Sequence, residues 1–215
     1  MRPVLLAVAA KFPQKEAAQA FQFLISLGVR LLIASTTRSG SVEQPLAFAA
    51  NEIFTGKITT PAELKKRLHD VTPNDEEFRI EFETARVSKA QLARYYLRSL
   101  EMAAKGESEP WFMPTDDRSV INLEHILPKK PDVNWPQFSE EEVGVFVNRL
   151  GNQALMRASD NSDLKSATFA DKKQTYSSSP YVLTSQIGDL AKWNAESVAV
   201  RQKALAQLAV SAWPV

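Results

Sequence analysis

The stretch Ile121-Asn122-Leu123-Glu124-His125-Ile126-Leu127-Pro128 decides how the second half of the chain is interpreted. Residues 120–127 are β-like in composition, and Pro128 ends the run. A histidine near the end of a short strand is held by backbone pairing while its ring faces a groove. Because the ordinary pKa of histidine lies near neutrality, His125 is a candidate general base.

Strand geometry separates the two ionisable residues of this stretch. Successive side chains of a β-strand point to opposite faces, so Glu124 and His125 are expected on different sides. Glu124 therefore reaches a metal beside His125 only if the strand bends or ends there. Taken alone, the stretch fits a half-buried structural histidine as well as a catalytic one.

The sequence after this stretch predicts a short extended piece and several helices. Residues 151–156 are expected to be extended. Ser139, with Glu142 three residues later, forms a capping box for a helix that ends near residue 149. A further helix is expected within residues 161–176, and two amphipathic helices close the chain. These closing helices are predicted at residues 184–193 and 196–212.

The chain before residue 105 has the apolar periodicity of amphipathic helices. Thr60-Pro61 and Thr72-Pro73 are placed as helix N-caps followed by proline at the first helical position. Residues 106–118 are rich in turn formers and lack a period, which marks a domain boundary. We therefore predict a helical bundle over residues 1–118 and a second domain over residues 119–215.

The amino-acid composition limits the kinds of metal site and covalent chemistry that the chain can support. The 215 residues are 44% hydrophobic and 24% charged, which is ordinary for a globular protein with a real core. The absence of cysteine excludes disulfides, iron–sulfur clusters and cysteine-ligated zinc. With only His69 and His125, a metal would need mainly oxygen ligands, which favours Mg²⁺ or Mn²⁺. The net charge of +1 does not by itself indicate a nucleic-acid binder.

Hydropathy predicts a cytoplasmic chain with no membrane span. The apolar run 24–34 is interrupted by Arg30 and is too short to cross a bilayer. Residues 1–10 resemble a signal peptide only faintly, since Lys11 follows where a small-residue cleavage site belongs. The chain begins inside apolar helical sequence, so we expect it to be a fragment of a longer protein.

Several motifs together resemble one known family, the C-terminal domain of GmrSD-type modification-dependent restriction endonucleases and related phage-defence proteins. The resemblance covers residue 120 to the C-terminus, and residues 2–105 are similar to the connecting helical region of the family, less specifically. The motifs are Glu124-His125-Ile126-Leu127-Pro128, Asn148-Arg149-Leu150-Gly151-Asn152, Asn161, Phe169-Ala170-Asp171-Lys172-Lys173, Tyr176, Trp193, Arg201 and Trp213-Pro214.

The resemblance implies a mainly α fold with a small β component. A helical connecting or docking domain would precede a ββα-metal (His-Me finger, HNH-like) nuclease core wrapped by helices. His125 matches the family's general base, and Asn152 matches the asparagine of the second strand that orients it. Asn161 and Glu124 match the metal shell. The lysines expected to bind DNA phosphates are Lys129, Lys130, Lys165, Lys172 and Lys173.

The chain departs from the family pattern at two places. Where relatives commonly have Gly-Asn-Leu-Thr-Leu-Leu, this chain has Gly151-Asn152-Gln153-Ala154-Leu155-Met156, with a polar glutamine in an apolar slot. Ser166 stands where a second asparagine is frequent. Both departures weaken the assignment of metal ligands more than that of the base.

The leading prediction is a metal-dependent DNA endonuclease that acts in restriction and phage defence with Mg²⁺ or Mn²⁺. Its expected partners are DNA and an upstream NTPase-like domain or partner subunit, and a homodimer is possible. The alternative is a catalytically inactive DNA-binding or protein-interaction module of a larger NTPase-linked defence protein. Taken singly, Asn152 also fits a turn residue, Asn161 a helix cap, and the lysine pairs a solvated face, whereas the inactive DNA-binding alternative has the lysines carry salt-sensitive DNA binding. For His69 we expect a structural role near a helix C-terminus.

Overall fold

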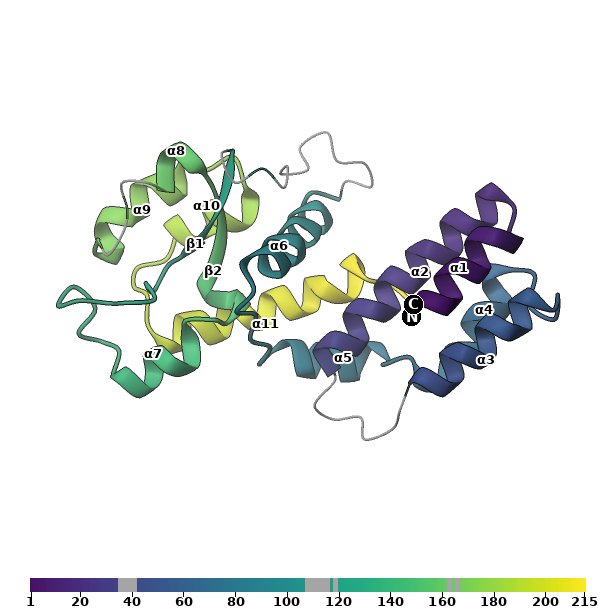
Figure 1. Ribbon diagram of the computed structural model, residues 1–215. Coiled ribbons are helices and arrows are strands. Elements are labelled where there is room, and N and C mark those ends of the chain that lie inside the picture. Colours follow the sequence, from purple (N-terminus) through teal and green to yellow (C-terminus); the bar gives the residue numbers. More distant parts are fainter. Residues whose placement is uncertain (35–41, 107–116, 118–119, 162–163, 165–166) are drawn as a thin grey trace. The chain divides into compact units, whose positions relative to one another are not determined.

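The computed structural model describes residues 1–34, 42–106, 117, 120–161, 164 and 167–215, and is shown in Figure 1. The described residues are mostly helical and include one small antiparallel sheet, as predicted. The chain packs into two compact units. One comprises residues 1–81 with 213–215, and the other comprises residues 82–212.

The first unit is a helical bundle, in agreement with the sequence. Helix α1 packs against α2 and α3, and α4 packs against α2 and α3. Apolar side chains at helical spacing, such as Val4, Leu24 and Ile53, fill the core between these helices. The helices are α1 (Arg2–Lys11), α2 (Gln14–Ile33), α3 (Glu43–Phe54), α4 (Pro61–Leu68) and α5 (Asp75–Phe82).

Helix α2 is long and apolar enough to cross a membrane by length and composition alone. In this unit it is a core helix, and its Arg30 is fully buried. The guanidinium of Arg30 donates to the carbonyls of Trp213 and Pro73 and to the carboxylate of Asp75. A single helix of this kind is weak evidence for a membrane span, since core helices of soluble proteins share its composition.

One of the two predicted caps is confirmed and the other is wrong. Thr60 and Glu63 form a reciprocal capping box at the start of α4. At the second position α5 begins at Asp75, and Asn74, not Thr72, accepts the backbone N–H of Glu77. Asparagine is a stronger N-cap than threonine, and the Thr72 hydroxyl instead donates to the Leu68 carbonyl.

The second unit surrounds the sheet with helices. Strand β1 pairs with β2 so that His125 lies opposite Gln153 and Glu124 opposite Ala154. Helix α6 packs against both strands and against α10 and α11, while α9 packs against α10. The elements are α6 (Ala90–Lys105), β1 (Ile121–His125), α7 (Glu140–Phe146), η3 (Leu150–Asn152), β2 (Gln153–Arg157), α8 (Ala158–Asn161), α9 (Phe169–Ser177), α10 (Val182–Gly188) and α11 (Ala195–Ala212).

The division between the units differs from the predicted domain boundary. It falls between residues 81 and 82 rather than between 118 and 119, because α6 belongs to the second unit. The apolar face of α6, with Tyr96, Leu97 and Leu100, is buried there. Residues 106–118 fall within the sequence range of the second unit, and most of them lie outside the described residues.

Local patterns around the sheet were predicted more accurately. The Ser139–Glu142 capping box opens α7, and β1 and β2 occupy the two expected extended segments. The predicted helix within residues 161–176 is present as α9, which starts at Phe169. After β1 the chain turns, and Ile126 and Leu127 enter the hydrophobic core together with Trp135 and Trp193.

Candidate active site

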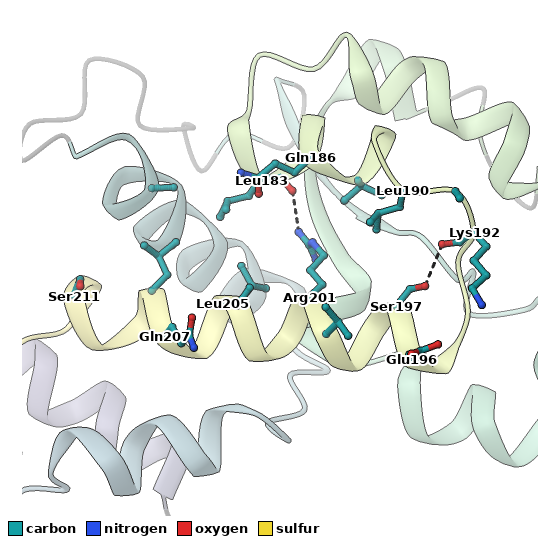
Figure 2. A pocket seen from close by; sticks show the side chains of 16 residues that line it. Leu183, Gln186, Leu190, Lys192, Glu196, Ser197, Arg201, Leu205, Gln207 and Ser211 are labelled. Carbon is teal, nitrogen blue, oxygen red and sulfur yellow. Dashed lines mark hydrogen bonds between the residues drawn. The ribbon is translucent and has the colours of Figure 1, made fainter.

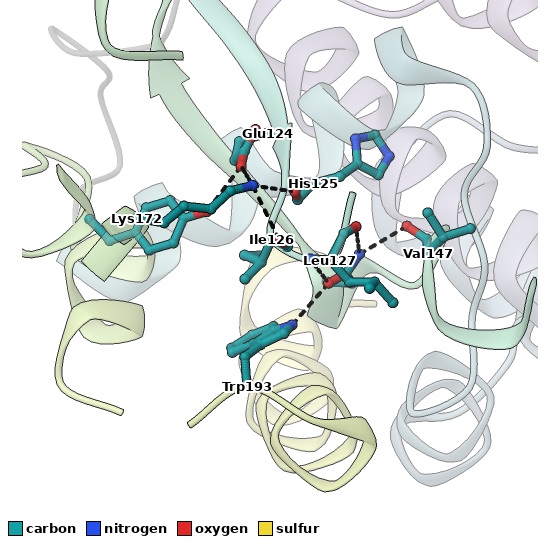
Figure 3. A network of polar contacts seen from close by, with 9 residues as sticks. Glu124, His125, Ile126, Leu127, Val147, Lys172 and Trp193 are labelled. Atoms are coloured by element: carbon teal, nitrogen blue, oxygen red, sulfur yellow. Dashed lines mark hydrogen bonds and ion pairs between the residues drawn. The ribbon is translucent and has the colours of Figure 1, made fainter. Parts of the chain in front are cut away.

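The two faces of β1 have different surroundings, as strand alternation predicts. Figure 3 shows the Glu124 carboxylate directed toward Lys172, while the ring of His125 points the other way. Glu124 is buried and His125 is half-buried. Each face is therefore a separate chemical environment.

On the Glu124 face of β1, the buried carboxylate forms an ion pair. Lys172, from α9, donates to Glu124 Oε1 at 2.7 Å, and the hydroxyl of Tyr176 donates to the same oxygen at 3.0 Å. Lys172 has no exposed side-chain surface and also contacts the carbonyls of His125 and Ile126. Burial raises the pKa of the Glu124 carboxyl, while Lys172 and Tyr176 oppose that rise. These contacts tie the end of β1 to α9.

The imidazole of His125, on the other face of β1, is uncharged at neutral pH. Burial, together with the positive charges of Lys129 and Lys172, lowers the pKa of His125 to about 4. At neutral pH the ring is therefore uncharged, and one of its nitrogens carries a lone pair that can accept a proton. The nearest recorded polar contact of the ring is with Gln153, whose Nε2 lies 3.3 Å from His125 Nε2.

Asn152 is fully buried and clamps the main chain just after His125. Its Oδ1 accepts the N–H of Leu127 at 2.8 Å and the indole N–H of Trp193 at 3.1 Å. Its Nδ2 donates to the carbonyls of Leu127 and Val147 at 2.9 and 3.2 Å. Asn152 ends η3 directly before β2 rather than lying on the second strand, and its side chain contacts the Leu127 backbone, not the ring of His125.

The predicted DNA-binding lysines do not share one environment. Lys129 and Lys130 are exposed in the turn after β1, and Lys173 is partly exposed on α9. Lys172 is a correction to the prediction: it is enclosed in the ion pair with Glu124 and has no surface that a phosphate can reach. Lys165 lies outside the described residues.

The predicted metal shell is not assembled by the described residues. Glu124 is held by Lys172 and Tyr176 on the face opposite His125, and nothing is described for the side chain of Asn161 in α8. Within the described part of the chain, no group of three or more histidine or acidic side chains is placed to hold a metal ion. Because Mg²⁺ is usually bound through carboxylates, the ion pair of Glu124 with Lys172 removes that carboxylate as a ligand in the arrangement seen here.

Gln153 was noticed in the sequence only as a polar residue in an apolar slot. In the structure it is 1% exposed, lies opposite His125 and donates to the Val87 carbonyl at 3.0 Å. Pairing the end of the first predicted strand with the start of the second would have revealed this neighbour. Arg201 was also missed as a support, since its Nη1 donates to the carbonyls of Leu150, Gly151 and Gln153.

A separate cavity of about 860 Å³ lies between α10, α11 and the end of α6, as Figure 2 shows. Its wall is mainly apolar and includes Leu183, Leu190 and Leu205, and Arg201 donates to the Leu183 carbonyl there. His125 is not among the residues that line it. The cavity is therefore distinct from the candidate active site.

The site as a whole is a half-buried neutral histidine at the end of a strand, with its backbone anchored by a buried asparagine and exposed lysines nearby. This arrangement defines a candidate site for proton abstraction. Residues 72–208, which contain both strands and the whole site, match the family described as GmrSD restriction endonucleases, C-terminal domain. The chain therefore belongs to that family of restriction endonuclease domains, whose nucleases act on DNA. None of the curated proteins compared with the chain matches it.

Proposed function

We propose that this chain is a DNA endonuclease of the His-Me finger (HNH) type, in which the imidazole of His125 takes a proton from the attacking water. One observation carries the proposal: His125 ends β1 inside the matched family range with a ring that is neutral at physiological pH. The hydroxide that forms attacks the phosphorus of a DNA phosphodiester in line and displaces the 3′ oxygen, which takes up a proton from solvent to give a 3′ hydroxyl and a 5′ phosphate.

The surrounding residues have compatible tasks. Asn152 holds the Leu127 main chain in place, which limits the movement of His125. Lys129 and Lys130, exposed directly after the strand, are proposed to contact DNA phosphates. Phosphodiester hydrolysis is commonly assisted by Mg²⁺ or Mn²⁺, and dependence on these ions is proposed from the family resemblance and measured directly in the assay.

The biological setting is a further part of the proposal. Family membership supports a role in the restriction of foreign DNA. From the resemblance noted in the sequence we extend this role to a phage-defence protein that works with an upstream NTPase-like domain or subunit. A cytoplasmic location, expected from hydropathy, and a possible homodimer belong to the proposal as well.

A nicking assay on supercoiled plasmid tests the proposal. The wild-type chain and His125→Ala are compared with Mg²⁺, with Mn²⁺ and with EDTA. We expect His125→Ala to be slower by at least about a hundredfold, the usual contribution of a general base. His69→Ala is the matched control, because His69 is the only other histidine and its side chain is 85% exposed. Equal rates for wild type and His125→Ala would refute the assignment.

A second candidate function is a non-catalytic DNA-binding module. It is favoured by one observation, that the carboxylate of Glu124, a predicted metal ligand, is held by Lys172 and Tyr176. It predicts no cleavage under any metal condition, together with DNA binding that weakens steeply as salt concentration rises. The nicking assay and a salt titration of DNA binding distinguish the two functions.

A further inference from the structure

Gln153 is the polar neighbour of His125 across the sheet. The two residues are direct partners in the antiparallel pair, and their Nε2 atoms lie 3.3 Å apart. Both atoms are nitrogens, so only one of them can donate. Which one donates determines where the ring proton of neutral His125 resides.

The Val87 carbonyl fixes the orientation of the Gln153 amide. Gln153 Nε2 donates to that carbonyl at 3.0 Å, and exchanging the amide nitrogen and oxygen would place two acceptors against each other. The amide NH₂ therefore has one hydrogen for Val87 and a second for His125. In this arrangement His125 Nε2 accepts, and the neutral ring carries its proton on Nδ1.

The same amide has an oxygen without a partner. Gln153 Oε1 is buried and has no described hydrogen-bond donor, which is unfavourable for a buried acceptor. If the amide turned over, Oε1 would accept an N–H from His125 Nε2, and the hydrogen bond to Val87 would be lost. The arrangement seen here satisfies both the Val87 carbonyl and His125 Nε2 and leaves one oxygen unsatisfied, whereas the turned amide would satisfy His125 Nε2 alone, so the arrangement seen here is the more stable of the two.

We propose that Gln153 is a positioning residue that selects the tautomer of His125, and that the arrangement seen here keeps the ring proton on Nδ1. The proposal rests on His125 being the general base. With the proton on Nδ1, the only lone pair of the ring faces the Gln153 amide and is withheld from water. Turning the amide over moves the ring proton to Nε2 by exchange with solvent, leaves the ring neutral, and frees the Nδ1 lone pair.

Two variants separate the possible effects of Gln153. In Gln153→Glu the carboxylate can only accept, so it favours the proton on Nε2. In Gln153→Leu the side chain has similar size and neither donates nor accepts, so it removes the preference. If Gln153 only fills space, leucine fills the same space, and Gln153→Leu leaves the tautomer of His125 unchanged.

Nitrogen NMR of the full chain with ¹⁵N-labelled histidine tests the proposal without requiring activity. The molecule has only two histidines, and exposed His69 serves as an internal reference. At neutral pH we expect wild-type His125 to carry its proton on Nδ1 with about a tenfold preference, the effect of one hydrogen bond. Gln153→Glu is expected to move the proton to Nε2. A wild-type spectrum with the proton on Nε2 would overturn the proposal, whether or not the variants fold.

Nicking rates complete the test. We expect Gln153→Glu, once shown to be folded, to cleave roughly tenfold faster than wild type at neutral pH, because the Nδ1 lone pair is free. A changed tautomer with an unchanged rate would overturn the link to catalysis. The two proposals fail differently: cleavage that survives in His125→Ala refutes the base, whereas a proton on Nε2 in wild type refutes only the role of Gln153.

Discussion

The two faces of β1 differ in how completely their polar groups are satisfied. On one face, Glu124 is enclosed with Lys172 and Tyr176 at hydrogen-bond distance. On the other face, His125 is half-buried, and beside it the Oε1 atom of Gln153 has no hydrogen-bond donor among the described residues. Adjacent residues of one strand thus have different surroundings: the Glu124 face joins β1 to α9, and the His125 face holds the proposed base beside Gln153.

Breaking the ion pair should have the largest effect on stability. Lys172→Met leaves Glu124 buried without its cation, and we expect the free energy of unfolding to fall by about 3–5 kcal/mol. Denaturant unfolding of the second unit measures it. Lys173→Met, at the next and partly exposed position of α9, is the control and should change stability by less than about 0.5 kcal/mol. Equal losses of unfolding free energy in the two variants would contradict a buried ion pair between Lys172 and Glu124.

Removing the Asn152 side chain, which holds the backbone at Leu127, should have the next largest effect on stability. Asn152→Ala leaves the Leu127 main chain and the Trp193 indole without their buried partners, so we expect a loss of about 2–3 kcal/mol in unfolding free energy. Asn194→Ala, which removes the N-cap of α11, should cost about 1 kcal/mol. If Asn152→Ala costs no more than Asn194→Ala, Asn152 is only a turn residue.

The pH dependence of cleavage and of stability should reflect the protonation of His125. The pKa of His125 falls from its ordinary 6.5 to about 4, so the base stays neutral above about pH 4 and cleavage should decline only as the pH falls through that value. Unfolded chains protonate this histidine near pH 6.5. The stability from burying the neutral ring is therefore complete above pH 6.5 and is lost as the pH falls toward 4.

Rates and unfolding free energies measured between pH 4 and pH 8 check both statements. The His125→Ala variant serves as control, because it should lose this contribution to the pH dependence of stability. A cleavage rate that already falls by half near pH 6.5 would show that His125 titrates as an exposed histidine.

The smallest effect is expected at the surface beyond the strand. Lys129→Gln should weaken DNA binding a few-fold and reduce the slope of log affinity against log salt by about one. Lys66→Gln, at an exposed position of α4 in the first unit, is the control and should leave both quantities unchanged. Fluorescence anisotropy with labelled DNA at several salt concentrations measures them.

Local features of the fold were predictable from sequence because they depend on few neighbouring residues. The capping boxes of Thr60 with Glu63 and Ser139 with Glu142 span three positions each, and the opposite directions of Glu124 and His125 follow from the geometry of a strand. The boundary predicted at residues 118 and 119 does not coincide with the division between the two compact units, because turn composition does not reveal which helices pack together.

Features that depend on distant contacts were not predictable. A lysine pair on a helix normally lies in solvent, and only the packing of α9 against β1 encloses Lys172 and separates it from Lys173. Likewise Gln153 acquires its significance from a register that places it opposite His125, 28 positions earlier in the chain. The charge and polarity of residues in the sequence identify candidate functional side chains, and their contacts in the folded chain determine what each of them does.

We propose that catalysis belongs to the His125 face of β1 and not to the Glu124 face. Plasmid nicking by His125→Ala and Glu124→Gln, measured side by side at equal concentrations of folded protein, tests it most directly. We predict that His125→Ala is slower than wild type by at least about a hundredfold, while folded Glu124→Gln stays within a few-fold of wild type. Loss of cleavage in folded Glu124→Gln, with cleavage retained in His125→Ala, would contradict the claim.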